Sequence, residues 1–164
     1  MKRYAVLFVV ALCLFFANNG NAQDYNSAIG LRLGYPLSLT YKTFISDDSA
    51  IEVFGGLRGY SSYSWVNVGG AYQVHKPIEG VDGLNWYFGG GASVFFWTYK
   101  NSFTGDGSAS TTFGILGNLG LDYKFADSPI NLSADWMPIF FIGNGFGSGF
   151  GGGYGALAVR YTLN

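Results

Sequence analysis

Cysteine, histidine, proline and charge are all scarce in this chain. Its 164 residues include one cysteine, one histidine and four prolines, and only 12% of them are charged, with a net charge of −1. So apolar a chain does not stay disordered in water. The lack of a basic run beyond Lys2 and Arg3 argues against nucleic-acid binding. The few prolines, with glycines that lack a period of three, exclude a collagen-like chain.

Glycine and aromatic residues are abundant instead. The chain has 26 glycines, and aromatic residues make up 19% of it. Both kinds of residue are poor helix formers, which disfavours a helical bundle. The length suits a single domain.

The first 22 residues have the order of a secretory signal peptide. Lys2 and Arg3 precede an apolar run over residues 4–17, and small polar residues lead to Ala22. A helix of that run spans about 21 Å, too short for a hydrocarbon core of about 30 Å. We expect a signal peptide over residues 1–22 and a mature domain over 23–164. Because the sole cysteine, Cys13, precedes the cleavage site, the mature domain has no disulfide.

The mature chain alternates between apolar and polar or small residues with a period of two, as strands do. Turn-forming residues separate eight such segments. The segments cover residues 29–35, 37–45, 50–58, 65–75, 84–97, 112–125, 130–141 and 156–163.

One face of each segment is a run of large apolar residues, whereas the other face mixes small residues with isolated charges. This distribution suits a membrane barrel, whose outer wall meets lipid and whose strands must close on themselves. Eight spanning strands of about 11 residues use roughly 88 residues and leave room for connections. We therefore expect an all-β, eight-stranded antiparallel up-and-down transmembrane barrel, with ten strands as an alternative. A soluble secreted barrel that binds a ligand is the rival from another class.

Three stretches carry a resemblance to a known family: residues 34–44, 83–91 and 120–129. With them the chain resembles the small outer-membrane β-barrel proteins of Gram-negative bacteria, which have the architecture of the outer membrane protein A transmembrane domain. The resemblance implies an outer-membrane location, contact with membrane lipids including lipopolysaccharide, and insertion by the outer-membrane assembly machinery. It also implies a monomer. The chain ends on Asn164, whereas such barrels often end on an aromatic residue.

No motif points to catalysis or to a cofactor. Gly147-x-Gly149-x-x-Gly152 matches a dinucleotide fingerprint, but an alternating strand follows it where a helix is needed. His75 ends its segment, so we interpret it as a turn or interfacial residue rather than a catalytic base. No cluster of residues has metal-ligand spacing. We expect a non-enzymatic protein without cofactor or metal.

Aromatic residues fall near both ends of the outward faces, where membrane barrels carry aromatic girdles. The girdle residues we expect are Tyr35, Tyr72, Trp86, Phe88, Phe96, Phe113, Tyr123, Phe125, Phe140 and Tyr161.

Charged residues on the inward faces must be paired or hydrated, because an isolated charge in a confined space is costly. The set is Arg32, Lys42, Glu52, Arg58, Asp122, Lys124, Asp135 and Arg160. We expect an ion-pair network that fills the lumen, with Asp135 and Arg160 as its first pair. Side chains that only reach trapped water are the alternative.

The sequence leaves the cellular task open among three candidates. Maintenance of the cell envelope comes first, because no motif demands more. Surface recognition or adhesion through residues 100–110 and 143–153 comes second. A narrow passive pore comes third, because side chains fill most eight-stranded lumens.

Overall fold

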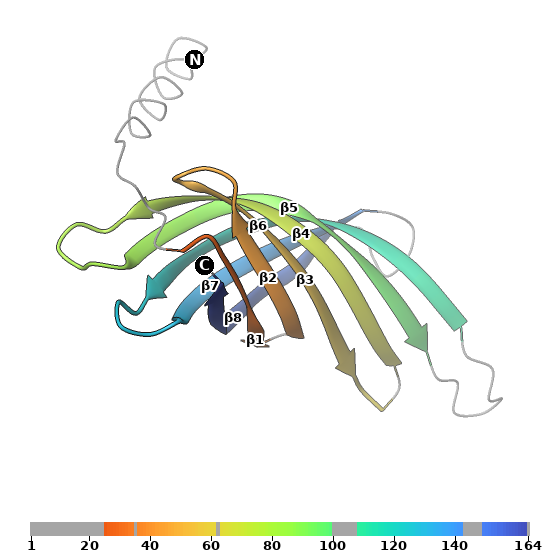
Figure 1. Cartoon of the computed structure of the whole chain (residues 1–164). Helices are drawn as coiled ribbons and strands as arrows, with labels where there is room; N and C mark the ends of the chain where they lie inside the picture. The colour runs from red at the N-terminus through yellow and green to blue at the C-terminus, as the bar shows by residue number, and fades with distance from the viewer. Residues whose placement is uncertain (1–24, 35, 62, 100–107, 143–148, 164) are drawn as a thin grey trace, which may run out of the picture.

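The computed structural model describes residues 25–34, 36–61, 63–99, 108–142 and 149–163. They form eight strands (Figure 1), whose bounds are β1 (Ser27–Gly34), β2 (Leu37–Phe44), β3 (Ser49–Gly59), β4 (Tyr63–Pro77), β5 (Leu84–Tyr99), β6 (Ser108–Lys124), β7 (Ile130–Ile142) and β8 (Gly149–Leu163). The expected signal peptide lies outside the described residues. In the described part of the chain, no helix is long and apolar enough to cross a membrane.

Each strand pairs antiparallel with its neighbour in sequence, and β8 pairs back with β1. The closing ladder joins Ser27 to Leu163 and Gly34 to Ala156. The sequence-based expectation of an eight-stranded up-and-down barrel is therefore confirmed, and the alternative of ten strands is wrong. Short turns over 45–48, 78–83 and 125–129 lie at one end, called the turn end below. The opposite end, which holds Tyr60 and Ser61, is called the loop end.

The outer wall of the barrel is apolar almost without interruption. The alternation turns large apolar side chains outward, so that Leu57 is 64% exposed and Phe113 is 58% exposed. Among outward positions of the described strands, one residue is charged. That residue is Lys76, which lies at the turn end and contacts Asp48 there.

The lumen has two different halves. Toward the turn end, buried charged and polar side chains fill the barrel. Toward the loop end, an apolar cluster fills it, made of Phe54, Trp65, Ala71, Phe95, Trp97, Leu116, Met137, Ile139 and Phe141.

Pro138 interrupts the ladder between β6 and β7. Near the turn, the amide of Phe125 donates to the carbonyl of Ile130. The alternation of an antiparallel ladder then places Pro138 where an N–H would donate to the carbonyl of Gly117. Proline has no N–H, and the register omits the pairs of Gly117 and Asn118 while continuing on both sides. Gly117 therefore lacks the donor that the ladder supplies elsewhere.

We expect Pro138→Val to stabilise the barrel. The added amide satisfies a carbonyl whose missing hydrogen bond costs about 1–3 kcal/mol. Loss of the proline ring lowers stability by roughly 0.4–1 kcal/mol through the unfolded chain. The net gain should be about 1 kcal/mol in urea unfolding of the reconstituted barrel.

Pro77→Val is the matched control for this experiment. Pro77 ends β4 and pairs with Asn85 of β5, but the amide of the next residue, Ile78, is the one that donates to β5, at Leu84. The nitrogen of Pro77 therefore points to the β3 side, where β3 begins only at Ser49, so the new amide has no partner in the ladder. An equal gain in both variants, or no gain in Pro138→Val, would contradict the interrupted ladder.

Candidate functional site in the barrel lumen

Glu52 on β3 is the centre of the charged half. Arg160 donates from Nη2 to Oε1 of Glu52 at 2.6 Å, and Arg32 donates to the same oxygen at 3.4 Å. Thr40 donates to Oε1 at 2.5 Å, and Gln73 donates to Oε2 at 2.6 Å. Both Glu52 and Arg160 are at most 1% exposed. One carboxylate thus holds side chains from β1, β2, β4 and β8.

A second carboxylate, Asp135 on β7, also binds Arg32, which thus contacts both Glu52 and Asp135. Arg32 donates from Nη2 to Asp135 at 2.6 Å, and the hydroxyl of Tyr87 donates to its other oxygen at 2.8 Å. Gly120 lies between Tyr87 and Asp135 in the register. A Cβ at Gly120 would come within 2.7 Å of the Tyr87 ring and of Asp135 Cβ. Glycine there lets the tyrosine cross β6 to the carboxylate.

A third carboxylate, Asp122 on β6, pairs with the only lysine of the network. Lys42 donates from Nζ to Oδ1 of Asp122 at 3.1 Å. Asn131 and Tyr25 donate to its other oxygen at 2.8 and 3.2 Å. The Lys42 ammonium also lies 4.5 Å from the centre of the Tyr87 ring, a favourable cation–π contact.

Six of the eight charged residues proposed from the sequence come together in this network: Arg32, Lys42, Glu52, Asp122, Asp135 and Arg160. They balance as three cations and three anions. The expected first pair, Asp135 with Arg160, is wrong. Asp135 pairs with Arg32, and Arg160 pairs with Glu52, because side chains reach across the lumen rather than along the ladder.

The other two charged residues lie outside the network. Lys124 ends β6 and donates to the carbonyls of Phe125 and Ser128, so it closes the β6–β7 turn. Arg58 lies near the loop end, where its guanidinium is 5.1 Å from the centre of the Tyr60 ring.

The position of His75 differs from the one predicted from the sequence. It is fully buried inside the barrel rather than placed at a turn or interface. Its ring stacks on Tyr87 with centroids 4.8 Å apart, and Nε2 lies 3.3 Å from Oε1 of Gln73. Its position next to a proline suggested a turn, but β4 continues to Pro77. The inward parity that it shares with Gln73 is the sequence signal that could have placed it in the lumen.

Most of the aromatic half of the lumen was not predicted from the sequence. The sequence predicted inward faces of small residues with a few charges, yet Trp65 and Phe95 are 2% and 0% exposed inside the barrel. Their rings lie 5.3 Å apart, and Phe95 meets Phe141 edge to face at 5.1 Å. Consecutive aromatic residues such as Phe95, Phe96 and Trp97 hide which ring turns inward.

The expected girdle residues lie on the outer wall where the structure describes them. Toward the turn end these are Tyr72, Trp86, Phe88, Tyr123, Phe125 and Tyr161, and toward the loop end Phe96, Phe113 and Phe140. Two neighbouring pairs contact each other, Trp86 with Phe88 at 5.4 Å and Tyr123 with Phe125 at 4.8 Å. Tyr35 lies outside the described residues.

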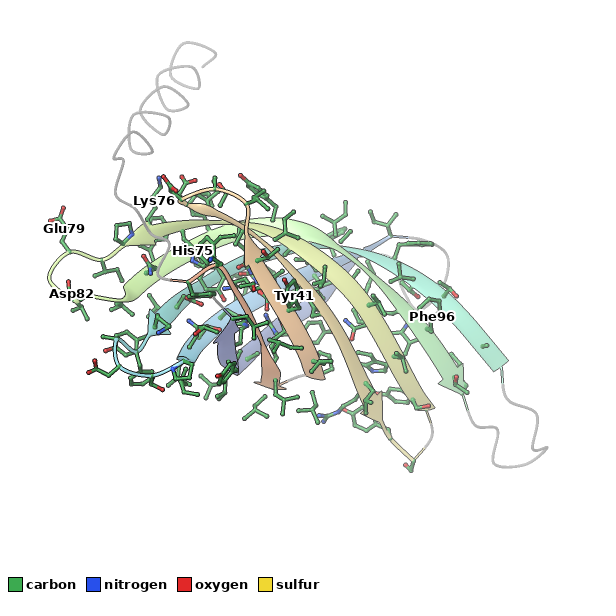
Figure 2. The ribbon with its side chains drawn as sticks, viewed as in Figure 1. Tyr41, His75, Lys76, Glu79, Asp82 and Phe96 are labelled. Carbon is green, nitrogen blue, oxygen red and sulfur yellow. The ribbon has the colours of Figure 1, made fainter. Side chains whose placement is uncertain are left out.

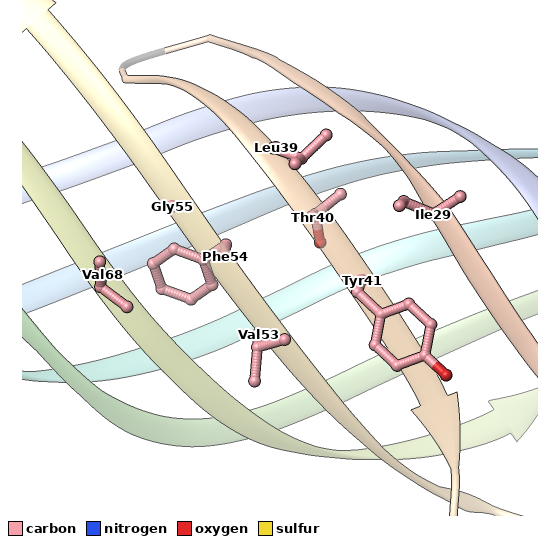
Figure 3. A pocket seen from close by; sticks show the side chains of 8 residues that line it. All are labelled: Ile29, Leu39, Thr40, Tyr41, Val53, Phe54, Gly55 and Val68. Carbon is pink, nitrogen blue, oxygen red and sulfur yellow. The ribbon is translucent and has the colours of Figure 1, made fainter.

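The outer wall also has shallow depressions. One of about 340 Å³ lies over Gly55, where the missing side chain leaves a gap between Leu39, Val53 and Val68 (Figure 3). Another, of about 400 Å³, lies beside Ala134 between Trp86 and Trp136. Both are lined mainly by outward apolar side chains.

Asp48 holds the turn between β2 and β3. Its carboxylate accepts hydrogen bonds from the Ser49 hydroxyl at 2.9 Å, the Ser46 hydroxyl at 3.1 Å and Lys76 Nζ at 3.4 Å. The Ser49 hydrogen bond is the main cause that lowers the pKa of Asp48, and Ser46 and Lys76 add to it against the opposing effect of partial burial.

Comparisons with known proteins support the fold. The structure matches the N-terminal β-barrel domain of Pseudomonas aeruginosa OprF with a TM-score of 0.65 at 18% identity, covering 86% of this chain and 100% of that one. It matches Neisserial surface protein A with a TM-score of 0.61 at 15% identity, covering 84% and 93%. It matches Ail, the attachment invasion locus protein of Yersinia pestis, with a TM-score of 0.52 at 12% identity, covering 84% and 96%.

These three solved structures are barrels of the kind found in bacterial outer membranes, so the resemblance in fold expected from the sequence is confirmed. No family model and no curated protein sequence matches the chain.

We expect Glu52→Gln to lower the free energy of unfolding by about 3–5 kcal/mol, because it leaves buried arginines without their shared counter-charge. Asp135→Asn should cost less, since Arg32 keeps its contact with Glu52. Urea unfolding in lipid vesicles measures both.

Glu79→Gln is the matched control, because Glu79 is exposed at the β4–β5 turn (Figure 2). Glu52→Gln combined with Arg160→Met removes both charges and should recover part of the loss. A Glu52→Gln barrel as stable as the parent would overturn the network.

Asp48 should make the barrel less stable in acid. Its pKa is lower in the folded state, so its contribution is present above the unfolded value of about 3.9 and disappears as the pH falls through the folded pKa. The thermal midpoint of the parent should exceed that of Asp48→Asn at pH 6, and this gap should close near pH 2. In a Ser49→Ala background, the difference in thermal midpoint at pH 6 between the barrel with Asp48 and the Asp48→Asn barrel should be smaller. A difference that does not change with pH would contradict the role of the Asp48 carboxylate in acid stability.

Proposed function

We propose that this protein is an integral outer-membrane barrel of a Gram-negative bacterium that helps to maintain the cell envelope, without catalysis and without conducting ions. The observation that carries the proposal is the inverted distribution of charge. Six buried charged side chains occupy the lumen, whereas Lys76 is the one charged residue at outward positions of the described strands. A protein surrounded by water has the opposite arrangement.

The apolar outer wall supports a lipid environment over the rival of a soluble ligand-binding barrel. Exposed side chains such as Leu39, Ile115 and Trp136, each 50–57% exposed, form one surface around the barrel. Soluble monomers rarely expose apolar patches larger than a few hundred Å². Aromatic residues at both ends of this wall suit the depth of lipid headgroups, including those of lipopolysaccharide.

The filled lumen supports a closed structural barrel over a pore. The charged network and the apolar cluster lie one after the other along the barrel axis, so an ion would have to pass both. In this proposal the chain acts as a monomer, delivered by its signal peptide and inserted by the assembly machinery. The turn end then faces the periplasm and the loop end faces the exterior.

Fractionation of cells separates the two classes of barrel. An outer-membrane barrel pellets with the membranes, resists extraction by urea and carbonate, and needs detergent for release. Recovery of the folded protein in the periplasm without detergent would favour the soluble rival.

We expect the reconstituted protein to pass no steady current in a planar bilayer. Glu52→Ala with Arg160→Ala should also stay closed, because the apolar cluster still blocks the lumen. Steady single-channel current through the parent would support a pore. Current only in the double variant would show that the charged half alone closes the lumen.

A further inference from the structure

A row of outward residues connects the depression beside Ala134 to the turn end. Lys76 on β4 lies opposite Trp86 in the register, and Trp86 lies opposite Leu121. Leu121 in turn lies opposite Ala134 on β7. Lys76 is one residue from the end of β4, whereas Ala134 is four residues beyond the start of β7. The row therefore begins at the edge of the outer wall and descends toward its middle.

The depression itself is apolar. Its large outward side chains come from Trp86, Leu119, Leu121 and Trp136. A neighbouring depression of about 180 Å³ shares Leu121 and Ala134 with it, and the two together are called the wall groove. The one charged residue that borders the wall groove is Asp135, whose carboxylate is held inside the lumen by Arg32. Such a surface suits hydrocarbon rather than a polar group.

A pair of opposite charges lies at the turn end of the same row. Nζ of Lys76 donates to Oδ2 of Asp48 at 3.4 Å, and both side chains are partly exposed. Among the described residues, this bond uses one of the three N–H donors of the ammonium. The hydroxyls of Ser46 and Ser49 bind the other oxygen of Asp48, Oδ1. The pair thus keeps two donors and a lone pair of Oδ2 for further partners.

This arrangement of charges matches one class of lipid headgroup. A phosphate can accept from Lys76 while a primary ammonium a few atoms away donates to Asp48, and both hydrogen bonds are charge-assisted. A quaternary ammonium has no N–H to donate, and an anionic headgroup offers Asp48 no cation. Glu79 and Asp82 on the exposed β4–β5 turn add negative charge at this end (Figure 2), which further disfavours an anionic lipid.

We propose that the Lys76–Asp48 pair and the wall groove together bind a zwitterionic glycerophospholipid of the phosphatidylethanolamine class. The headgroup contacts the charged pair, and an acyl chain lies in the groove past Trp86. The inference rests on the proposed membrane location, and it goes further because the rest of an apolar wall does not select a headgroup. The depression over Gly55 is the internal comparison, since no charged residue lines it.

Selectivity is measured by tryptophan quenching in phosphatidylcholine vesicles that contain a fixed small fraction of a lipid brominated on its acyl chains. Trp86 and Trp136 line the wall groove, whereas Trp65 and Trp97 are buried in the lumen. Brominated phosphatidylethanolamine should be preferred about five-fold over brominated phosphatidylcholine, the upper range for one exposed ion pair. Brominated phosphatidylglycerol should show no preference.

Two variants test the charged pair. Asp48→Asn should remove the preference for phosphatidylethanolamine and create one for phosphatidylglycerol, because Lys76 then has no neighbouring carboxylate to neutralise it. Lys76→Met should remove both preferences. A purely structural role of the pair would not reverse the choice of headgroup, and circular dichroism checks that each barrel is folded.

A second pair of variants tests the groove. Ala134→Leu fills it and should lower the preference for phosphatidylethanolamine toward that of the surrounding lipid. Gly55→Leu is the matched control, because it fills a depression of similar size without a charged residue. The Gly55→Leu barrel should select phosphatidylethanolamine as the parent does.

The results that would overturn this inference differ from those that would overturn the membrane location. Equal quenching by the three brominated lipids, in a barrel that needs detergent for extraction, would remove the lipid site and leave the location intact. So would a preference that Asp48→Asn and Lys76→Met leave unchanged, or one that Gly55→Leu lowers as much as Ala134→Leu does. Release of the folded protein from cells without detergent would overturn the location and the lipid site together.

Discussion

Closure of the backbone hydrogen-bond ladder is the constraint on which the other features of this barrel depend. In the hydrocarbon core an unpaired amide or carbonyl cannot form a hydrogen bond to water, so a sheet that spans the membrane must join its first strand to its last. The ladder between β1 and β8 does this from Ser27 to Gly34. Closure also fixes which residues face inward, because every strand keeps its alternation. The lumen contacts follow from that single geometric requirement.

The two halves of the lumen solve the same packing problem with different chemistry. Three carboxylates and three cations pair with one another toward the turn end, and hydroxyl and amide groups add further hydrogen bonds to them. Toward the loop end, rings such as Trp65 and Phe95 fill the lumen through apolar contacts. An ion network specifies register through directed contacts, whereas an apolar cluster stabilises through burial. Together they fill the lumen along its axis in the described part of the chain.

The seventh strand is where this regular structure is least regular. Pro138 withholds a ladder hydrogen bond from β6, and a register shift with β8 follows between Ile139 and Phe140. The irregular part of the strand lies toward the loop end, above the charged network. Departures from the simplest barrel thus gather toward the loop end, whereas the turn end is closed by short turns and paired charges.

The sequence by itself determined the strand count, the antiparallel order and the facing of residues such as Leu39, Glu52 and Trp86, because a period of two assigns each residue to a face without knowledge of any other strand. It could not determine which charges meet. Arg160 and Glu52 are 108 residues apart, and their contact depends on the stagger of the closed barrel and on side chains that cross its interior. The contacts of His75 with Tyr87 and of Phe95 with Phe141 inside the barrel depend on the same stagger. Only the tertiary structure decides such contacts, because they arise from closure of the whole ring of strands and not from the pattern within any one strand.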